Sequence, residues 1–473
     1  MKVRLIYLAG VIALTCCSVG PQYRRPAPDV PDSFRAQEET PSEQSLADLT
    51  WWDIYQDKTL QQLLQTALAQ NRDVKIAAAR MAEARAQVGV SHLAQLPQAN
   101  FSLSAQRGRV FLGRDAVTGA LFNGAADVSF EVDVWQRLAS LSDVARANLL
   151  ATEYARSSVQ IGLIGDVAAT YFILLSLDQQ FNIAERTAAT RERFFQLTQR
   201  KFRRGAAAGL DVSRAEASLA AVRAVLPDLQ RQIAQTENQL QILLGLNPAP
   251  IARVRLDLQA MPVPRDVPAG LPSALLERRP DVRQAELNLV AATANVRAAK
   301  AALFPTISLT GSYGSESFEL SKLFSGPTRI WSFGLNLLQP LINAQRSGFQ
   351  VDAAQARREQ AILQYQSTVA QAFRDVSDAL AARRGYTDFV REQEQQVNAL
   401  RTASFRVLRR YEVGYSSYFE VIDADSNLLT AELQLVQAYR NNLISLVQLY
   451  KALGGGWEQI ASLPDASPPM KQP

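Results

Sequence analysis

The chain has 473 residues and a formal net charge of +5, from 50 lysine and arginine residues against 45 aspartate and glutamate residues. An excess this small does not indicate binding to nucleic acid or to an anionic membrane surface. A single histidine, His92, and two adjacent cysteines leave almost no material for a metal site, a disulfide or a catalytic triad, and no glycine-rich phosphate loop occurs. We therefore predict that the protein is not an enzyme and binds no metal.

The first 16 residues have the features of a secretory signal peptide. Lys2 and Arg4 precede an apolar run at 5–14 that is too short to span a bilayer. The run leads into the motif LTCCS at 14–18, which resembles a bacterial lipobox. The resemblance implies cleavage before Cys17 and a covalent lipid on its sulfur. The residue after Cys17 is not aspartate, which favours delivery to the outer membrane. An ordinary signal peptide followed by incidental cysteines is the alternative.

Two proline-rich stretches are expected to lie outside the main helices. Residues 17–50 indicate an extended tether that leads from the lipid to the first helix. Residues 246–272 indicate a junction that lies outside the helices as a belt, together with the proline-containing tail 454–473.

The chain contains one unit twice, at 51–245 and at 273–453. Asn71-Arg72-Asp73-Val74 aligns with Arg279-Pro280-Asp281-Val282 at an offset of 208, and Leu244-Gly245 aligns with Leu453-Gly454 at an offset of 209. An offset that stays nearly constant over most of the chain indicates a tandem internal duplication.

Each copy is expected to hold a first helix, one very long helix and a shorter one. The long segments are free of proline, and each would form a helix of about 100 Å at 1.5 Å per residue. Helices this long pack lengthwise as coiled coils. We expect the two long segments of this chain to be too polar to cross a membrane. The predicted helices are 59–96, 137–203 and 210–245 in the first copy and 273–304, 343–413 and 418–453 in the second.

Strands are expected between the first and the long helix of each copy. Apolar and polar residues alternate there, so one face of each strand meets an apolar environment and the other meets water. A soluble β-sandwich shows the same alternation, but the flanking long helices favour strands that span a membrane. The predicted strands are about 100–106 and 127–135, separated by a polar glycine-rich loop, and about 306–313 and 329–338.

The polar faces of these strands predict a water-filled lumen. Asp127, Glu131 and Asp133 would line it, while Tyr313 and Trp331 at one end and Trp135 at the other would form aromatic girdles. Four strands cannot close a barrel, because the smallest barrels have about eight. Two chains would give eight strands and a lumen filled by side chains, and three would give twelve with room for water.

Two segments resemble the periplasmic tips of TolC-type outer-membrane efflux proteins: FRRGAAAGLDV at 202–212 and YEVGYSSYFEVIDA at 411–424. VGPQYRRP at 19–26 and Trp51-Trp52 are similar to the lipoprotein (NodT-like) branch of that family. The resemblance covers essentially the whole mature chain. It implies an α+β fold and a homotrimer, with a 12-stranded barrel in the outer membrane and a coiled-coil periplasmic tunnel. It also implies two partners, a periplasmic adaptor and an inner-membrane resistance–nodulation–division pump.

The resemblance assigns adaptor docking to the two helical turns, at Arg204-Gly205 and Val413-Gly414. The glycines have a simpler explanation as well, because a helix that turns back needs a left-handed residue at its C-terminus.

The resemblance further places Asp423 at the periplasmic aperture, where a trimer would bring three carboxylates together, with Glu420 one turn away. It ties Tyr411 to Asp211 in the other hairpin. Arg214 takes the place of Asp423 in the first copy; it either pairs with an acidic residue of the aperture or is a solvated surface arginine. Asp211 and Glu420 also suit helix N-termini, where negative charge is favourable.

Three functions compete. The leading one is a passive exit duct for an efflux pump that expels drugs or other small toxic molecules. The second is the outer-membrane duct of a type I protein-secretion system, which has the same fold and a polypeptide substrate. The third is a coiled-coil lipoprotein without a pore.

Overall fold

The computed structural model describes residues 19–27, 30–35, 45–49, 51–54, 56–112, 115–253, 257–261, 270–339 and 344–455. The predicted signal peptide, Cys17 and nearly all of the predicted tail lie outside these ranges. The chain divides into two compact units. The first comprises Met1–Pro28, Ala79–Tyr154 and Gln284–Thr368, and the second comprises Asp29–Ala78, Ala155–Arg283 and Val369–Pro473.

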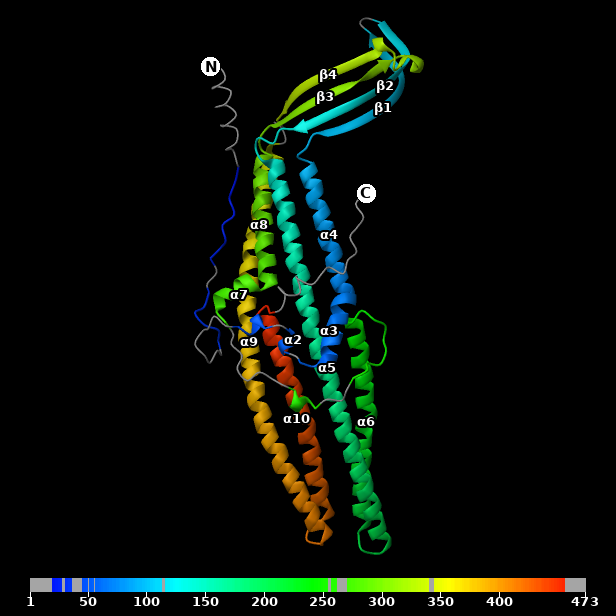
Figure 1. The fold of residues 1–473 in the computed structure, drawn as a ribbon, viewed down its shortest axis with the longest axis vertical. Helices are drawn as coiled ribbons and strands as arrows, with labels where there is room; N and C mark the ends of the chain where they lie inside the picture. Colours follow the sequence, from blue (N-terminus) through cyan, green and yellow to red (C-terminus); the bar gives the residue numbers. More distant parts are fainter. Residues whose placement is uncertain are drawn as a thin grey trace. The chain divides into compact units, whose positions relative to one another are not determined.

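The first unit contains a four-stranded antiparallel sheet (Figure 1). Its strands, paired in chain order, are β1 (Gln98–Leu112), β2 (Asp115–Glu131), β3 (Thr306–Ser317) and β4 (Arg329–Leu338). The prediction of a loop between residues 106 and 127 is wrong, because β1 and β2 pair across this stretch as far as Leu112 and Asp115. Glycines and alanines obscure the alternation there, whereas backbone pairing does not require polar and apolar side chains to alternate.

The register gives the sheet an apolar and a polar face, because residues directly opposite one another share a face. One apolar row runs across the four strands through Phe101, Ala126, Tyr313 and Trp331. The adjacent polar row runs through Asn100, Asp127, Ser312 and Ser332. Trp331 is 78% exposed and Phe101 is 72% exposed in the single chain, so the apolar face lacks a covering layer there.

The main helices follow the same order in both copies. The first copy has α3 (Lys58–Gln70), α4 (Arg72–Leu93), α5 (Arg137–Arg203) and α6 (Gly209–Leu243). The second has α7 (Pro272–Arg278), α8 (Pro280–Ala301), α9 (Ala344–Glu412) and α10 (Tyr418–Ala452). Shorter elements are η1 (Leu46–Asp48), α2 (Trp51–Ile54), η2 (Leu258–Ala260), η3 (Leu320–Lys322) and η4 (Gly326–Thr328).

The helix expected at the start of each copy is broken in two. In the first copy Asn71 leaves the helical conformation, and its Oδ1 accepts hydrogen bonds from the N–H groups of Asp73 and Val74 at the start of α4. In the second copy Arg279 is extended, as a residue before proline is biased to be. A cap in one copy and a proline in the other therefore produce the same break.

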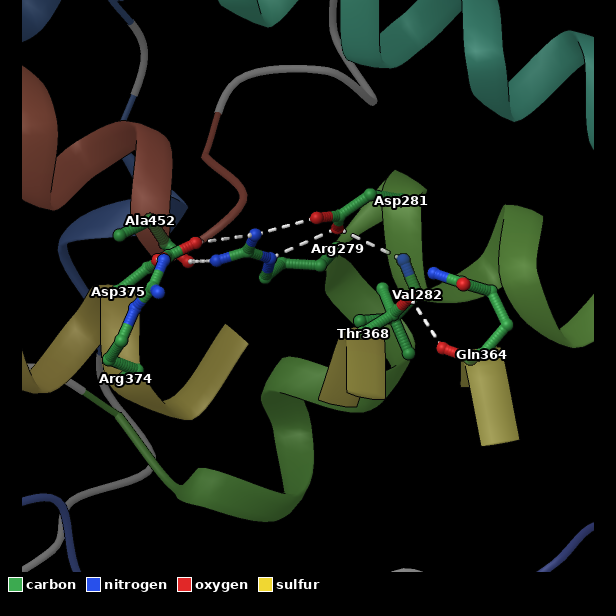
Figure 2. A network of polar contacts seen from close by, with 8 residues as sticks. All are labelled: Arg279, Asp281, Val282, Gln364, Thr368, Arg374, Asp375 and Ala452. Carbon is green, nitrogen blue, oxygen red and sulfur yellow. Dashed lines mark hydrogen bonds and ion pairs between the residues drawn. The ribbon is translucent and has the colours of Figure 1, made fainter. Parts of the chain in front are cut away.

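The two copies also close in the same way, within the second unit. Asn71 Nδ2 donates to the carbonyl of Leu243 at 2.9 Å, and Arg279 donates to the carbonyl of Ala452 at 3.2 Å (Figure 2). Burial works against the charge of Arg279, but hydrogen bonds and attraction to Asp281 and Asp375 outweigh it and raise its pKa. The last helix of each copy is thus fastened to the break in its first helix.

The core of the second unit includes the middle of α5. Val167, Ala168, Tyr171, Leu174 and Leu175 are fully buried. The prediction that the long helices are too polar to cross a membrane is wrong for α5, because by length and composition this helix has a stretch that could do so. However, 61% of that stretch is buried inside the chain. We therefore interpret it as protein core, as the coiled-coil prediction requires.

Candidate functional site: the two helical turns and the strand faces

The turn between α5 and α6 depends on the backbone of Gly205. This residue has a φ of +72°, and the N–H of Ala206 bonds to the carbonyl of Lys201 at 2.9 Å, a Schellman arrangement. A side chain at Gly205 would meet no atom within 4 Å. The glycine is therefore needed for its conformation and not for space.

The turn between α9 and α10 repeats this geometry. Gly414 has a φ of +87°, and the N–H of Tyr415 bonds to the carbonyl of Arg410 at 2.8 Å. Val413 and Tyr415 are largely exposed beside it. The second turn therefore presents apolar side chains to solvent on a fixed backbone.

Glu420 belongs to the cap of α10. Its carboxylate accepts the N–H of Ser417 at 3.0 Å, and the Ser417 hydroxyl accepts the N–H of Glu420 at 3.3 Å, which is a capping box. The hydrogen bond from the backbone of Ser417 lowers the pKa of Glu420. The N-cap residue of α6, which corresponds to Ser417, is Ala208, and its side chain has no hydrogen-bond acceptor.

Tyr411 lies in an aromatic cluster between the hairpins. Its ring is 5.7 Å from that of Tyr418, and Lys201 Nζ lies 4.4 Å above it. Burial raises the pKa of Tyr418 to about 12. Among the described residues Tyr411 makes no hydrogen bond with Asp211, so the contact that the resemblance implied is absent from the single chain. The packing of the ring brings it against Lys201 instead.

Asp423 is exposed on α10, one turn beyond Glu420, and accepts a hydrogen bond from Asn427 Nδ2 at 3.2 Å. Arg214 is also exposed, and its guanidinium lies 5.3 Å from the ring centre of Phe419 on α10. Of the two roles left open for Arg214, the structure supports neither in full: its contact is a cation–π contact with an aromatic ring.

Arg191 is a residue of this region that the sequence interpretation missed. Its Nε donates to Asp425 Oδ2 at 2.8 Å, its Nη1 to the carbonyl of Ser218 at 2.9 Å and its Nη2 to Ser426 Oγ at 3.3 Å. Arg191 itself is 8% exposed. It therefore connects α5 with both α6 and α10.

The acidic residues predicted for the lumen have three different environments. Asp127 lies on the polar face and accepts a hydrogen bond from Ser102 at 3.3 Å. Glu131 forms a two-pronged pair with Arg137, at 2.7 and 3.0 Å. Asp133 is not in a strand, which corrects the predicted end at 135: β2 ends at Glu131, and Asp133 accepts the N–H of Ala139 in the first turn of α5 at 2.8 Å.

Trp135 also lies outside the strands. Its ring stacks on Phe304 at 4.7 Å, and its Nε1 donates to the carbonyl of Pro305 at 2.9 Å. Tyr313 and Trp331, by contrast, are directly opposite one another on the apolar face.

The family model of the outer membrane efflux proteins matches the chain twice, over residues 63–246 and 271–455. Each match spans one copy of the duplication, from its first helices to the glycine after its last helix. The chain belongs to this family.

Relatives and solved structures agree with this assignment. The efflux protein is 34% identical to the cation efflux system protein CusC of Escherichia coli O6:H1 over 461 residues, 96% of this chain and 99% of CusC. It is 32% identical to the probable outer membrane lipoprotein SilC of Salmonella typhimurium over 460 residues, 96% of this chain and 99% of SilC. The outer-membrane channel OprN superposes with a TM-score of 0.87 at 29% identity, over 93% of this chain and 100% of OprN.

The chain is thus an outer-membrane efflux channel with the α+β fold of TolC-type ducts. The turns and strand faces described above are parts of that channel.

Proposed function

We propose that three copies of this efflux protein form one 12-stranded barrel, continued by a tunnel of helices, through which drugs or other small toxic molecules leave the periplasm passively. The observation that carries the proposal is the four-stranded sheet with an exposed apolar face and with β1 and β4 at its edges. In lipid an unpaired backbone group costs several kcal/mol, so these edges need partner strands.

The polar face favours three copies over two. An eight-stranded barrel is filled by its own side chains, whereas a twelve-stranded one leaves room for water. Asp127 and Glu131, with serine and asparagine residues beside them, suit a wet lumen. Covered by an apolar filling, the same carboxylates would cost several kcal/mol each.

We further propose that the channel docks a periplasmic adaptor and, through it, an inner-membrane pump of the resistance–nodulation–division class. CusC is named as a protein of a cation efflux system. This name supports a multi-protein assembly for the present chain as well. The two turns suit docking because Arg204, Gly205, Val413 and Gly414 are exposed, and each turn is closed by a backbone hydrogen bond.

Docking can be tested without disturbing the turn itself. Val413→Glu adds a charge at an exposed residue whose backbone is not in the left-handed region, so trimer yield should stay normal while efflux is lost. Gly385→Glu is the matched control, because Gly385 on α9 has open space around it. Crosslinking that placed the adaptor only on residues 246–272 would contradict this docking site.

We also propose that Cys17, which lies outside the described residues, carries a covalent lipid. The name of SilC and the motif at 14–18 support it. The described tether lies against α8, where Tyr23 donates to Glu286 at 2.9 Å and Arg25 pairs with Glu286 at 3.3 Å. Mass spectrometry of the mature N-terminus should find an acylated Cys17; an unmodified N-terminus elsewhere would exclude the anchor.

The function is tested in a strain that lacks its own outer-membrane efflux channels. Expressed together with a periplasmic adaptor and a pump of the resistance–nodulation–division class, the chain should lower the accumulation of a fluorescent dye and raise drug tolerance. Secretion of a polypeptide without any change in dye accumulation would favour the type I secretion duct.

A further inference from the structure

The loop between β3 and β4 folds back onto the sheet. A side chain at Gly124 of β2 would lie 3.9 Å from Leu323 Cδ2 and 4.0 Å from Phe324 Cε1. Leu323 is 1% exposed, whereas Phe324 beside it is 78% exposed. Leu323 and the ring of Phe324 therefore lie over Gly124, within van der Waals range of where its side chain would begin, and most of Phe324 remains exposed.

The face on which the loop rests is the apolar one. Gly124 is directly opposite Leu103, whose Cδ1 lies 3.2 Å from where a side chain at Gly124 would begin. Leu103 shares its face with Phe101, two residues earlier in the same strand, and Gly124 with Ala126. Leu323 and Phe324 therefore extend the apolar face that faces lipid in an outer-membrane channel.

Short helical turns and hydrogen bonds within the loop hold Phe324 on the apolar face. It contains two short helical turns, η3 and η4, and the hydroxyl of Thr328 lies 2.8 Å from the carbonyl oxygen of Leu323 and 2.6 Å from that of Ser325. Lys322 and Glu319 form an exposed ion pair at 2.9 Å within the same loop. Apolar and charged groups thus lie next to one another, as at a membrane interface.

We propose that residues 318–328 form an interfacial element of the channel, with Phe324 seated in the lipid of the outer leaflet. The loop lies at the end of the strands opposite the helices of its unit (Figure 1). Tyr313 and Trp331 lie opposite one another near this end of β3 and β4. Aromatic residues at this depth are typical of barrels in outer membranes. The inference rests on the proposed barrel, because only a closed barrel turns this face to lipid.

Phe318 of the same loop provides an internal contrast. It lies 3.7 Å from where a side chain at Gly119 would begin. Gly119 is five residues from Gly124 along β2, so the two belong to opposite faces. Phe318 therefore lies on the polar, lumen side, while Phe324 lies on the lipid side.

The test uses the full acylated protein in proteoliposomes, with Phe324→Cys or Phe318→Cys labelled by an environment-sensitive fluorophore. The label at 324 should emit at shorter wavelength, lose emission to phospholipids that carry a nitroxide near the headgroup, and resist aqueous iodide. The label at 318 should respond to iodide. Ser325→Cys, at an exposed neighbour of Phe324, is a second position in case the first disturbs the loop.

Quenching of the 324 label by iodide alone would overturn the proposal, as would quenching by neither agent, which would mean that a neighbouring subunit covers the loop. Single-channel conductance is recorded on the same preparations. Normal conductance with a water-exposed 324 label refutes only the interfacial loop, whereas missing conductance refutes the channel itself.

Discussion

Arg191 occupies a position of α5 where the coiled-coil spacing favours an apolar side chain. Leu177, Ala184 and Thr198 lie at intervals of seven from it and are buried. A guanidinium is tolerated in this row because each of its three nitrogens has an acceptor on another helix. Its main partner, Asp425, is 234 residues away in the chain. No local pattern predicts such a contact, although an arginine in a buried heptad row marks the position as unusual.

Breaking this pair should loosen the two hairpins of the chain. Asp425→Asn removes the charge from a partly buried hydrogen bond, which costs about 1–3 kcal/mol. We expect a lower unfolding temperature of the helical part and a higher resting conductance in planar bilayers. Arg231→Met is the control, because Arg231 and Asp228 form an exposed pair on α6. Equal effects of both changes would show that Arg191 has no special role.

A substitution of Asp423 tests the periplasmic aperture proposed for the trimer. Three carboxylates near one axis attract cations and repel one another, so Asp423→Asn should reduce cation selectivity and weaken block by multivalent cations. The reversal potential in a salt gradient measures the first effect. Asp228→Asn, which removes a carboxylate from the exposed surface of α6, should leave it unchanged. An unchanged reversal potential in Asp423→Asn would place the aperture at other residues.

The helix elements differ in how far the sequence predicts them. Proline-free runs predict α5 and α9 well, because nothing in them interrupts backbone hydrogen bonding. The breaks at Asn71 and Arg279 could have been found, since Asn is a favoured N-cap and the residue before Pro280 is biased to be extended. They were missed because the residues on both sides of each break are typical of helices, rich in Ala, Gln and Arg.

The ends of the strands and the environments of their acidic residues are harder to predict from the sequence. Alternation identifies the two faces, but the glycine-rich stretch 107–126 hides the length of the hairpin. Asp133 continues the alternation of β2 and yet caps α5, because the unpaired N–H groups of a helix start compete for the same carboxylate. The positions of Leu323 and Phe324 follow from loop packing, which no strand pattern encodes.

The capping box gives α10 a start that α6 lacks, and this difference depends on pH. The pKa of Glu420 is lowered in the folded chain, so its stabilising effect is complete above its unfolded pKa and is lost as pH falls through the folded value. Hydrogen exchange should show protection at the start of α10 falling on acidification relative to the start of α6, where Ala208 provides no side-chain cap. Ser417→Ala should abolish the difference between the two turns at neutral pH.

At the scale of the whole molecule, the exposed sheet depends on assembly. One chain supplies four strands with two open edges, an exposed apolar face and a polar face. The unpaired edges of the sheet and the exposed apolar face are unfavourable in the single chain. A closed oligomeric barrel in lipid pairs the edges, covers the apolar face and leaves the polar face in water. The sequence predicts the need for an oligomer from strand number alone, whereas the choice of three copies rests on the wet lumen and on the family resemblance.

The most direct test is single-channel recording from the purified full protein in planar lipid bilayers. We predict discrete conductance steps that favour cations, with larger resting steps in Asp425→Asn than in the unchanged protein. A protein that is folded and inserted in the membrane, yet gives no conductance steps in either form, would contradict the channel and leave a coiled-coil lipoprotein without a pore.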